Sequence, residues 1–230
     1  MTAKLYALIP RRPDLSDEAF HQHWRTTHAD LARRISSLRR YVQSHRLPVH
    51  TGLPPSPYEG IAEAYFDDAA AGLAMGEDPE YTEHALKDEP NFMDVPGLAF
   101  LVTTEEVIEE GPPRGPEAVG VKLLQLVRRP AGTDHASWRE ELLAADHVAV
   151  GNSLRAERHV IALCVPESYG TEGSEPLFDA VRELSWPTLE DFQRARDSAA
   201  WARLVDPGLM DEDSVAADVA EEYRVIWPQG

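Results

Sequence analysis

Two stretches with the same order of residue types decide the fold: KLYALIPRRP at positions 4–13 and VKLLQLVRRP at positions 121–130. In each, an apolar segment of strand length, Lys4–Ile9 or Val121–Val127, is followed by arginine and proline. The order of elements expected after the first stretch recurs after the second, although few residues are identical. The sequence therefore predicts a tandem repeat of one structural unit.

The first half has the pattern strand, helix, strand, strand, helix, strand, which is the order of a ferredoxin-like β-α-β-β-α-β module. Ser16 is the predicted N-cap of the first helix, and Asp17 and Glu18 favour the positive end of its dipole. The predicted strands are Lys4–Ile9, Arg40–His45, Gly60–Phe66 and Leu98–Val107. The predicted helices cover 16–34 and Asp68–Met75, and another begins over Pro79–Ala85.

The second half repeats this order: strands Val121–Val127, Arg158–Cys164, Phe178–Ser185 and Ala220–Ile226, helix His135–Ala149 and a helix pair over Leu189–Leu204. A four-stranded antiparallel sheet with helices on one face leaves its other face apolar and uncovered. Two such sheets packed face to face form an α/β barrel. We therefore expect an α+β fold in which one chain supplies both halves of a pseudo-dimer.

A stretch rich in proline and glycine, EEGPPRGPEA at 109–118, is the predicted linker between the modules. The first module then covers residues 1–108 and the second covers residues 119–230.

The net charge of −18 over 230 residues argues against nucleic acid or an anionic membrane as partner, because proteins bind the phosphate groups of such partners with clustered Lys and Arg side chains. The single cysteine, Cys164, excludes an internal disulfide and is expected in the core. There is no pattern of a secretory signal and no apolar run of the ~18 residues that a membrane span needs. We expect a cytoplasmic protein, either a monomer that is an internal pseudo-dimer or a homodimer.

Four residues at spacings of four, four and three share one face of the first predicted helix: Phe20, Trp24, His28 and Leu31. Burial beside two aromatic rings would disfavour the charged form of His28 and leave a neutral base. The alternative is a packed histidine that bonds a backbone carbonyl. His21 and His23 fall on other faces, where we expect solvent.

On the second predicted strand, Tyr41, Gln43 and His45 share one face, and Val42 and Ser44 share the other. If the polar row opposes the helix, it lines a wet pocket, and His45 becomes a second candidate acid or base. If the alternation is shifted by one residue, the row faces solvent.

On the third predicted strand, Glu63 and Tyr65 share a face with Ile61. Glu63 could orient a nearby imidazole or raise its basicity, or it could be a rim residue. Asp88 opens the segment DEPNF at 88–92 and is a candidate for catalysis, for an Asx turn or for a helix cap. Phe92 is expected in a hydrophobic wall.

The motifs of several enzyme classes are absent. The sequence contains no HExxH or acidic EF-hand loop, so no metal site is predicted. It also lacks GxGxxG, GxxxxGKS and GxSxG, which disfavours nucleotide binding and serine hydrolysis.

Four segments in order resemble the EthD-like family of the dimeric α/β-barrel superfamily: FHQHWRTTHADL at 20–31, RYVQSH at 40–45, YEGIAEAYFD at 58–67 and DEPNF at 88–92. The resemblance covers about residues 4–107. The second half is similar to a degenerate copy of the first. Its counterparts of Phe20, Trp24, His28 and Tyr41 are Trp138, Leu142, Asp146 and His159.

This resemblance implies one working pocket for a small molecule, between sheet and helices of the first module, used without metal or organic cofactor. Our leading hypothesis is a cofactor-independent lyase, cyclase or isomerase that dehydrates, decarboxylates or cyclises an aromatic or polyketide-like molecule by acid–base catalysis. The alternatives are a non-catalytic accessory or ligand-binding protein of a biosynthetic or degradation pathway, and a cofactor-free oxygenase. The candidate catalytic residues are His28, His45 and Asp88. The candidate substrate contacts are Tyr6, Trp24, Tyr41, Gln43, Glu63, Tyr65 and Phe92.

Overall fold

A computed structural model describes residues 2–116, 120–169 and 175–228. The first module contains β1 (Ala3–Ile9), α1 (Asp17–His23), a π-helical turn (Trp24–His28), α2 (Ala29–Ala32), β2 (Arg40–Arg46), β3 (Gly60–Phe66), α3 (Ala69–Leu73), a second π-helical turn (Tyr81–Ala85), α4 (Leu86–Asp88) and β4 (Ala99–Glu109). The second module contains β5 (Val121–Val127), α5 (His135–Ala149), α6 (Gly151–Leu154), β6 (Arg158–Cys164), β7 (Ala180–Trp186), α7 (Leu189–Arg196) and β8 (Ala216–Ile226). Short 3₁₀ turns include Met75–Glu77, Glu89–Asn91, Val95–Gly97, Pro166–Ser168 and Ala199–Leu204.

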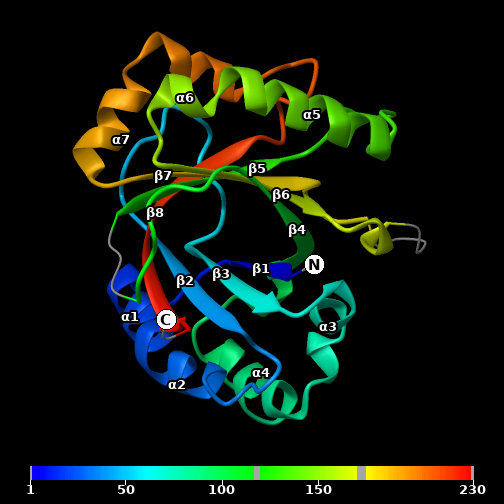
Figure 1. The fold of residues 1–230 in the computed structure, drawn as a ribbon. Helices are drawn as coiled ribbons and strands as arrows, with labels where there is room; N and C mark the ends of the chain where they lie inside the picture. The colour runs from blue at the N-terminus through cyan, green and yellow to red at the C-terminus, as the bar shows by residue number, and fades with distance from the viewer. Residues whose placement is uncertain (1, 117–119, 170–174, 229–230) are drawn as a thin grey trace.

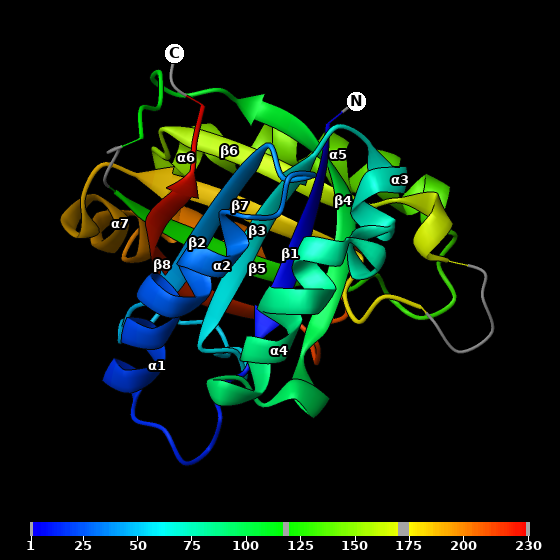
Figure 2. The ribbon, with the colours of Figure 1, turned by 90° about the horizontal axis from the view of Figure 1, so that it is seen from below.

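The strands close into one barrel in the order β1-β3-β2-β8-β5-β7-β6-β4, and all neighbours are antiparallel. Two pairings join the modules, β2 with β8 and β4 with β6. Helices of the first module lie on one side of the barrel and α5, α6 and α7 lie on the opposite side (Figure 1). Figure 2 shows α1, α2 and α4 in front of β1, β2 and β3. The predicted α+β barrel, made by one chain from two ferredoxin-like modules, is confirmed.

The first helix begins as predicted, because the Ser16 hydroxyl accepts a hydrogen bond from the backbone N–H of Ala19 at 3.2 Å. The helix differs from the prediction in its middle, where the π-helical turn interrupts the α-helix. The predicted linker begins inside β4, which ends at Glu109, and its residues 117–118 lie outside the described residues.

Strand alternation divides the side chains between the barrel interior and the helices. In β1, Leu5, Ala7 and Ile9 pack in a cluster with the first-module helices, whereas Tyr6 and Leu8 belong to a cluster inside the barrel. Each position on a strand therefore has one fixed environment.

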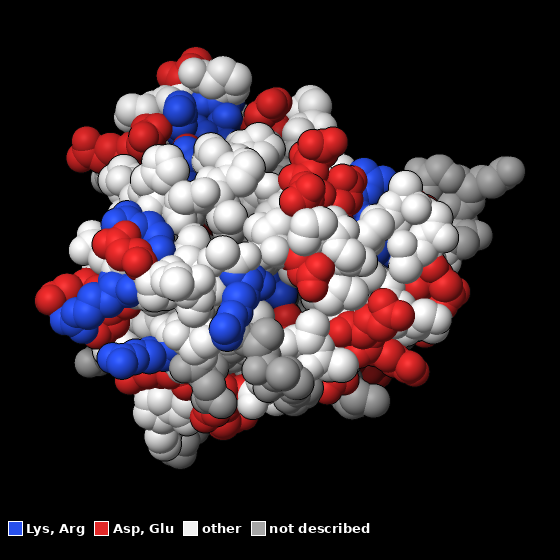
Figure 3. All heavy atoms as spheres, turned by 90° about the horizontal axis from the view of Figure 1, so that it is seen from above, with Lys and Arg blue, Asp and Glu red and all other residues white. Residues whose placement is uncertain are grey.

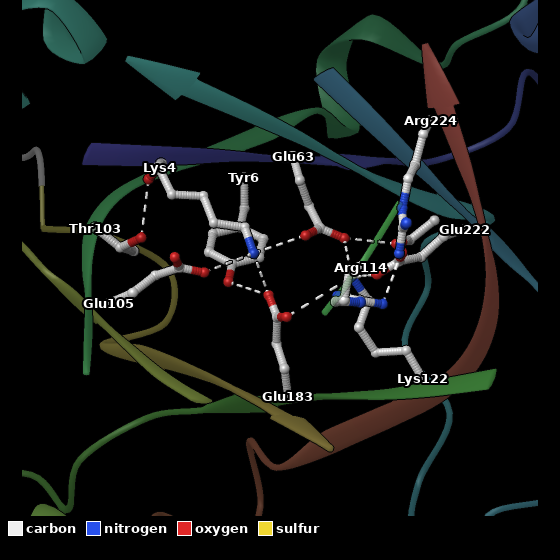
Figure 4. Close-up of polar contacts among 11 residues, drawn as sticks. Lys4, Tyr6, Glu63, Thr103, Glu105, Arg114, Lys122, Glu183, Glu222 and Arg224 are labelled. Atoms are coloured by element: carbon white, nitrogen blue, oxygen red, sulfur yellow. Dashed lines mark hydrogen bonds and ion pairs between the residues drawn. The ribbon is translucent and has the colours of Figure 1, made fainter. Parts of the chain in front are cut away.

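Part of the barrel interior is ionic, so the prediction of an apolar inner face is wrong there (Figure 4). The Lys4 ammonium lies 2.6 Å from Glu63, 3.2 Å from Glu105 and in contact with Glu183. The Lys122 ammonium contacts Glu63 and lies 3.7 Å from Glu183 and 3.1 Å from Glu222. Two arginines complete this ionic network: Arg114, 2.9 Å from Glu222, and Arg224, 2.7 Å from Glu222.

The ionic network repeats the internal symmetry of the chain. Lys4 and Lys122 are the second residues of β1 and β5, and Glu63 and Glu183 are the fourth residues of β3 and β7. Each lysine contacts glutamates of both modules, so these ion pairs connect the two halves. Burial alone lowers the pKa of Lys4, but Glu183 and Glu63 outweigh it and hold that pKa well above its usual value.

On the face formed by the second-module helices, Lys and Arg are interspersed with Asp and Glu rather than gathered in one patch (Figure 3). Among the described residues, no helix has the length and apolar character needed to cross a bilayer.

Replacing one buried lysine should destabilise the fold strongly. In Lys122→Met, Glu63 and Glu222 lose a buried partner, so we expect the free energy of unfolding to fall by ~3–5 kcal/mol in urea titrations. The control is Lys87→Met, because the Lys87 side chain is 64% exposed and pairs with Glu83 at the surface, and it should change stability by less than ~0.5 kcal/mol. Equal effects of the two substitutions would contradict a structural role for the ionic network.

Candidate active site

A small cavity of about 50 Å³ lies between the sheet and the helices of the first module. Its polar lining consists of His28, Tyr41, Tyr81 and Glu89. Small side chains on the sheet leave the space open, namely Ala7, Ala62 and Ala64. The cavity is on the side of the sheet where the EthD-like resemblance implies a pocket.

His28 is held by an ionised carboxylate. Its Nδ1 lies 3.1 Å from Asp88, and the same carboxylate lies 2.9 Å from Nε2 of His23 and accepts a hydrogen bond from Asn91 at 3.0 Å. Burial raises the pKa of Asp88, but the hydrogen bonds from His28, Asn91 and His23 outweigh it and lower that pKa to about 2. In the His28 tautomer that donates its Nδ1 proton to the ionised Asp88, the Nε2 atom carries the lone pair. Among the described residues, none is hydrogen-bonded to Nε2.

Phe92 packs against the histidines rather than lining the cavity. Its ring centroid lies 4.9 Å from that of His28, 5.0 Å from that of His23 and 5.6 Å from that of Phe20. It therefore fixes the two imidazoles that share Asp88.

Trp24 and Gln43 support the site from behind. The Gln43 amide donates a hydrogen bond to the backbone carbonyl of Trp24 at 2.7 Å, within the π-helical turn that ends at His28. The Trp24 indole donates to the Tyr41 hydroxyl at 3.2 Å. Burial raises the pKa of Tyr41 to about 12, although hydrogen bonds from Trp24 and Gln43 lower it, so the phenol is protonated at neutral pH. Wider helical turns of this kind are frequent at functional sites.

Glu89 and Tyr81 are cavity residues that the sequence analysis missed. The Tyr81 hydroxyl donates to the Glu89 carboxylate at 2.8 Å. Burial is the main reason that the pKa of Glu89 rises to about 7, with the charge of Asp88 adding to the shift and the Tyr81 hydrogen bond opposing it. Glu89 is part of the DEPNF segment, but its burial depends on packing against distant strands, which no local pattern reveals.

His45 faces the helices as the unshifted alternation predicts, but it does not reach the cavity. Its Nε2 donates to the Gln43 side-chain oxygen at 3.1 Å, and its Nδ1 lies 2.8 Å from Nδ1 of His21. Burial, together with Arg25 and His21, lowers the pKa of His45 to about 2. With both nitrogens engaged, His45 supports the site and does not fit the predicted role of second acid or base. The expectation that His21 and His23 are in solvent is also wrong, because both side chains are partly buried and contact His45 and Asp88, respectively.

Tyr6, Glu63 and Tyr65 lie on the other side of the sheet. Glu63 pairs with Lys4, which also lies beside Tyr6 (Figure 4). The Lys4 ammonium is 4.5 Å from the centroid of the Tyr6 ring and 5.0 Å from that of the Tyr65 ring. These side chains point into the barrel, and none of the three lines the cavity. Glu63 is buried and paired with Lys4, so neither alternative weighed for it, orienting an imidazole or lying at a rim, is correct. The sequence showed correctly that Glu63 and Tyr65 share a face with Ile61 but did not show which face is the inner one.

The second module has the same layout with the space filled. Gln125 in β5 occupies the position that Ala7 has in β1, and Arg182 in β7 occupies the position that Ala62 has in β3. Arg182 donates to Asp146 at 2.7 Å and to Gln125 at 2.5 Å, and His159 lies 2.9 Å from Asp146. All four side chains are buried. Asp146, at the position of His28, is thus the centre of an ion-paired core.

No group of three His, Cys, Asp or Glu side chains suited to a metal ion occurs among the described residues. Cys164 is buried in the second module, and its thiol donates to the backbone carbonyl of Phe178 at 3.3 Å. Burial raises its pKa, so it is a core thiol rather than a nucleophile.

The close approach of β3 to Trp24 can be tested. A Cβ atom on Gly60 would lie 2.2 Å from the Trp24 ring, so Gly60→Ala must displace this buried ring, which packs on the same helical segment as His28. We expect a loss of ~1–3 kcal/mol in the free energy of unfolding, measured in urea. Gly76→Ala is the control, since a Cβ there meets no atom within 4 Å. A Gly60→Ala protein as stable as Gly76→Ala would show that this contact does not constrain the helix.

Comparison with known proteins identifies the fold and one domain. Residues 12–96 match the EthD domain. An anthrone oxidase-like protein has the same fold over 97% of this chain and 93% of its own, with 9% identity and a TM-score of 0.61. A chlorite dismutase variant of Candidatus Nitrospira defluvii matches 96% of this chain and 91% of its own, with 10% identity and a TM-score of 0.54.

An EthD-family protein of Bacillus halodurans is 27% identical, covers 46% of this chain over its whole length and has a TM-score of 0.39. No curated protein matches the sequence. Residues 12–96 therefore match the EthD domain, and the chain itself supplies both halves of a closed eight-stranded α+β barrel.

Proposed function

We propose that the protein is a cofactor-independent enzyme that moves a proton on a neutral aromatic or polyketide-like ketone, as a step of a lyase, cyclase or isomerase reaction. The observation that carries this proposal is the arrangement of His28. Its Nδ1 faces the ionised Asp88, and its Nε2 is left for the cavity. A carboxylate in this position fixes the tautomer and stabilises the imidazolium that forms when Nε2 takes a proton.

The reaction begins with transfer of a carbon-bound proton from the substrate to Nε2 of His28. The electron pair of the broken C–H bond moves onto the carbonyl oxygen and gives an enolate. Protonated Tyr41 lines the same cavity, as does Glu89, and the phenol and the protonated form of Glu89 can donate hydrogen bonds to that oxygen. The imidazolium then returns the proton to another carbon in an isomerisation, or to a leaving hydroxyl group in a dehydration.

The contribution required from this site is modest. A positioned base and a hydrogen-bond donor typically accelerate such proton transfers by ~10²–10⁴-fold. Polyketide-like ketones enolise readily, so this range is sufficient for their dehydration or cyclisation.

A cofactor-free oxygenase is the second candidate, because an enolate or phenolate made by His28 is also the electron-rich species that reacts with dioxygen. Two proteins of the same architecture are described as anthrone oxidase-like and as a chlorite dismutase. At 9% and 10% identity they support the fold alone, so the proposal rests on the site.

Exchange of substrate protons with solvent tests the proposed step directly. Anthrone is a suitable three-ring ketone, because its exchange in D₂O without oxygen passes through the enol and can be followed by NMR. We expect the enzyme-catalysed exchange rate constant to fall by ~10²–10⁴-fold in His28→Gln. His84→Gln is the control, since the His84 side chain is 40% exposed and pairs with Glu80 at the surface. Full exchange in His28→Gln would refute the catalytic assignment, and binding by the wild type without exchange would favour an accessory protein.

The pH dependence should identify Glu89. Because its pKa is about 7, the exchange rate should fall as pH rises through 7 and the donor ionises, and Glu89→Gln should lack this descending limb. The folded protein retains this proton while the unfolded chain loses it near pH 4.5. Stability in urea should therefore decline between about pH 4.5 and 7 in the wild type, and less so in Glu89→Gln. A pH profile that Glu89→Gln leaves unchanged would exclude Glu89 as the donor.

A further inference from the structure

A wide groove opens beside the His28 cavity. It has a volume of about 590 Å³, and four of its lining residues also line the cavity, namely Leu5, Met75, Tyr81 and Phe100. Groove and cavity are therefore adjacent, with these four side chains between them. Tyr81 links them chemically as well, because its hydroxyl donates to Glu89.

The two spaces differ in what they can hold. Ligand pockets for drug-sized molecules typically measure ~300–1,000 Å³. The cavity of about 50 Å³ is far below this range, whereas the groove of about 590 Å³ lies within it. A ring system fits the groove, and only a small reacting end of the molecule fits the cavity.

The groove concentrates exposed apolar surface. Leu73, Phe100 and Leu177 are 47%, 43% and 47% exposed, and all three line it. Large apolar side chains gathered at one concave surface mark a binding site for an apolar partner. Since Leu73 follows β3 and Leu177 precedes β7, both modules contribute to this surface.

The second module also supplies charge. Glu167 and Glu175 line the groove, together with Ser168, and no Lys or Arg is among the described residues that line it. Carboxylates at an apolar surface repel an anionic ligand and leave a neutral one unaffected.

We infer that this groove, completed by Leu177 and the acidic residues of the second module, binds the ring system of a neutral polycyclic ketone whose carbonyl end reaches His28. The inference rests on the proposed function for the identity of the reacting end. The second module then takes a direct part in substrate selection, although the space between its own sheet and helices is filled by side chains.

Binding measurements with matched ligands test the groove. The probes are anthrone, with three rings, and phenylacetone, with one ring, each titrated against the intact protein by fluorescence. In Leu177→Arg and in Leu73→Arg, at two residues that line the groove but not the cavity, we expect the Kd for anthrone to rise ~10-fold and the Kd for phenylacetone to change less than ~2-fold. Val107→Arg is the control, since Val107 is 41% exposed and lies outside the groove; both affinities should stay at the wild-type value.

A negatively charged three-ring ligand tests the effect of the acidic residues. Anthracene-9-carboxylate should bind more weakly than anthrone, and Glu175→Gln should reduce the difference between the two Kd values. Unchanged anthrone affinity in both groove variants, or absence of anthrone binding by the wild type, would overturn the groove assignment. The groove and the proposed reaction can fail independently. If anthrone binding depends on the groove residues but no proton exchange occurs, the groove assignment holds and the proposed reaction is refuted. If exchange depends on His28 but anthrone binding does not depend on the groove residues, the reaction holds and the groove assignment is refuted.

Discussion

In a closed barrel, each strand residue faces either the interior or the helices, and this constraint governs the rest of the molecule. Lys4 and Glu63 point inward and join the two modules by ion pairs. Ala7 and Ala62 are at strand positions of the opposite alternation, so they point outward and leave the space beside His28. A one-residue shift of either strand would exchange these roles, so the site depends on the register that the ionic network holds in place.

The two modules show that a shared fold does not by itself produce a shared site. Their strands occupy equivalent places, but side-chain volume differs at the positions beneath the helices. Alanines leave a cavity in the first module, whereas Arg182 in the second extends across the same space to Asp146. Asp146 is buried in an ion pair with Arg182 and is therefore not available to a ligand. His28, which contacts Asp88 through Nδ1, has its Nε2 atom available to a ligand.

The sequence predicted the order and the approximate limits of the strands, because alternation, turn residues and the tandem repeat are local signals. It also placed Phe20, Trp24 and His28 on one buried face. It could not show that Glu63 lies inside the barrel, since alternation defines which residues share a face but not which face is inner. Glu89 was missed because its burial, and hence its raised pKa, arises from distant packing. The ionic network joins residues of both modules and has no local signature.

The central claim is that the protein has one ligand site, at the first-module cavity and its groove. A crystal structure of the protein with bound anthrone tests it most directly. The account predicts electron density for the rings beside Phe100 and Leu177, with the reacting end directed to His28. Density inside the barrel next to Lys4 and Glu63, or between the second-module helices and Arg182, would contradict it.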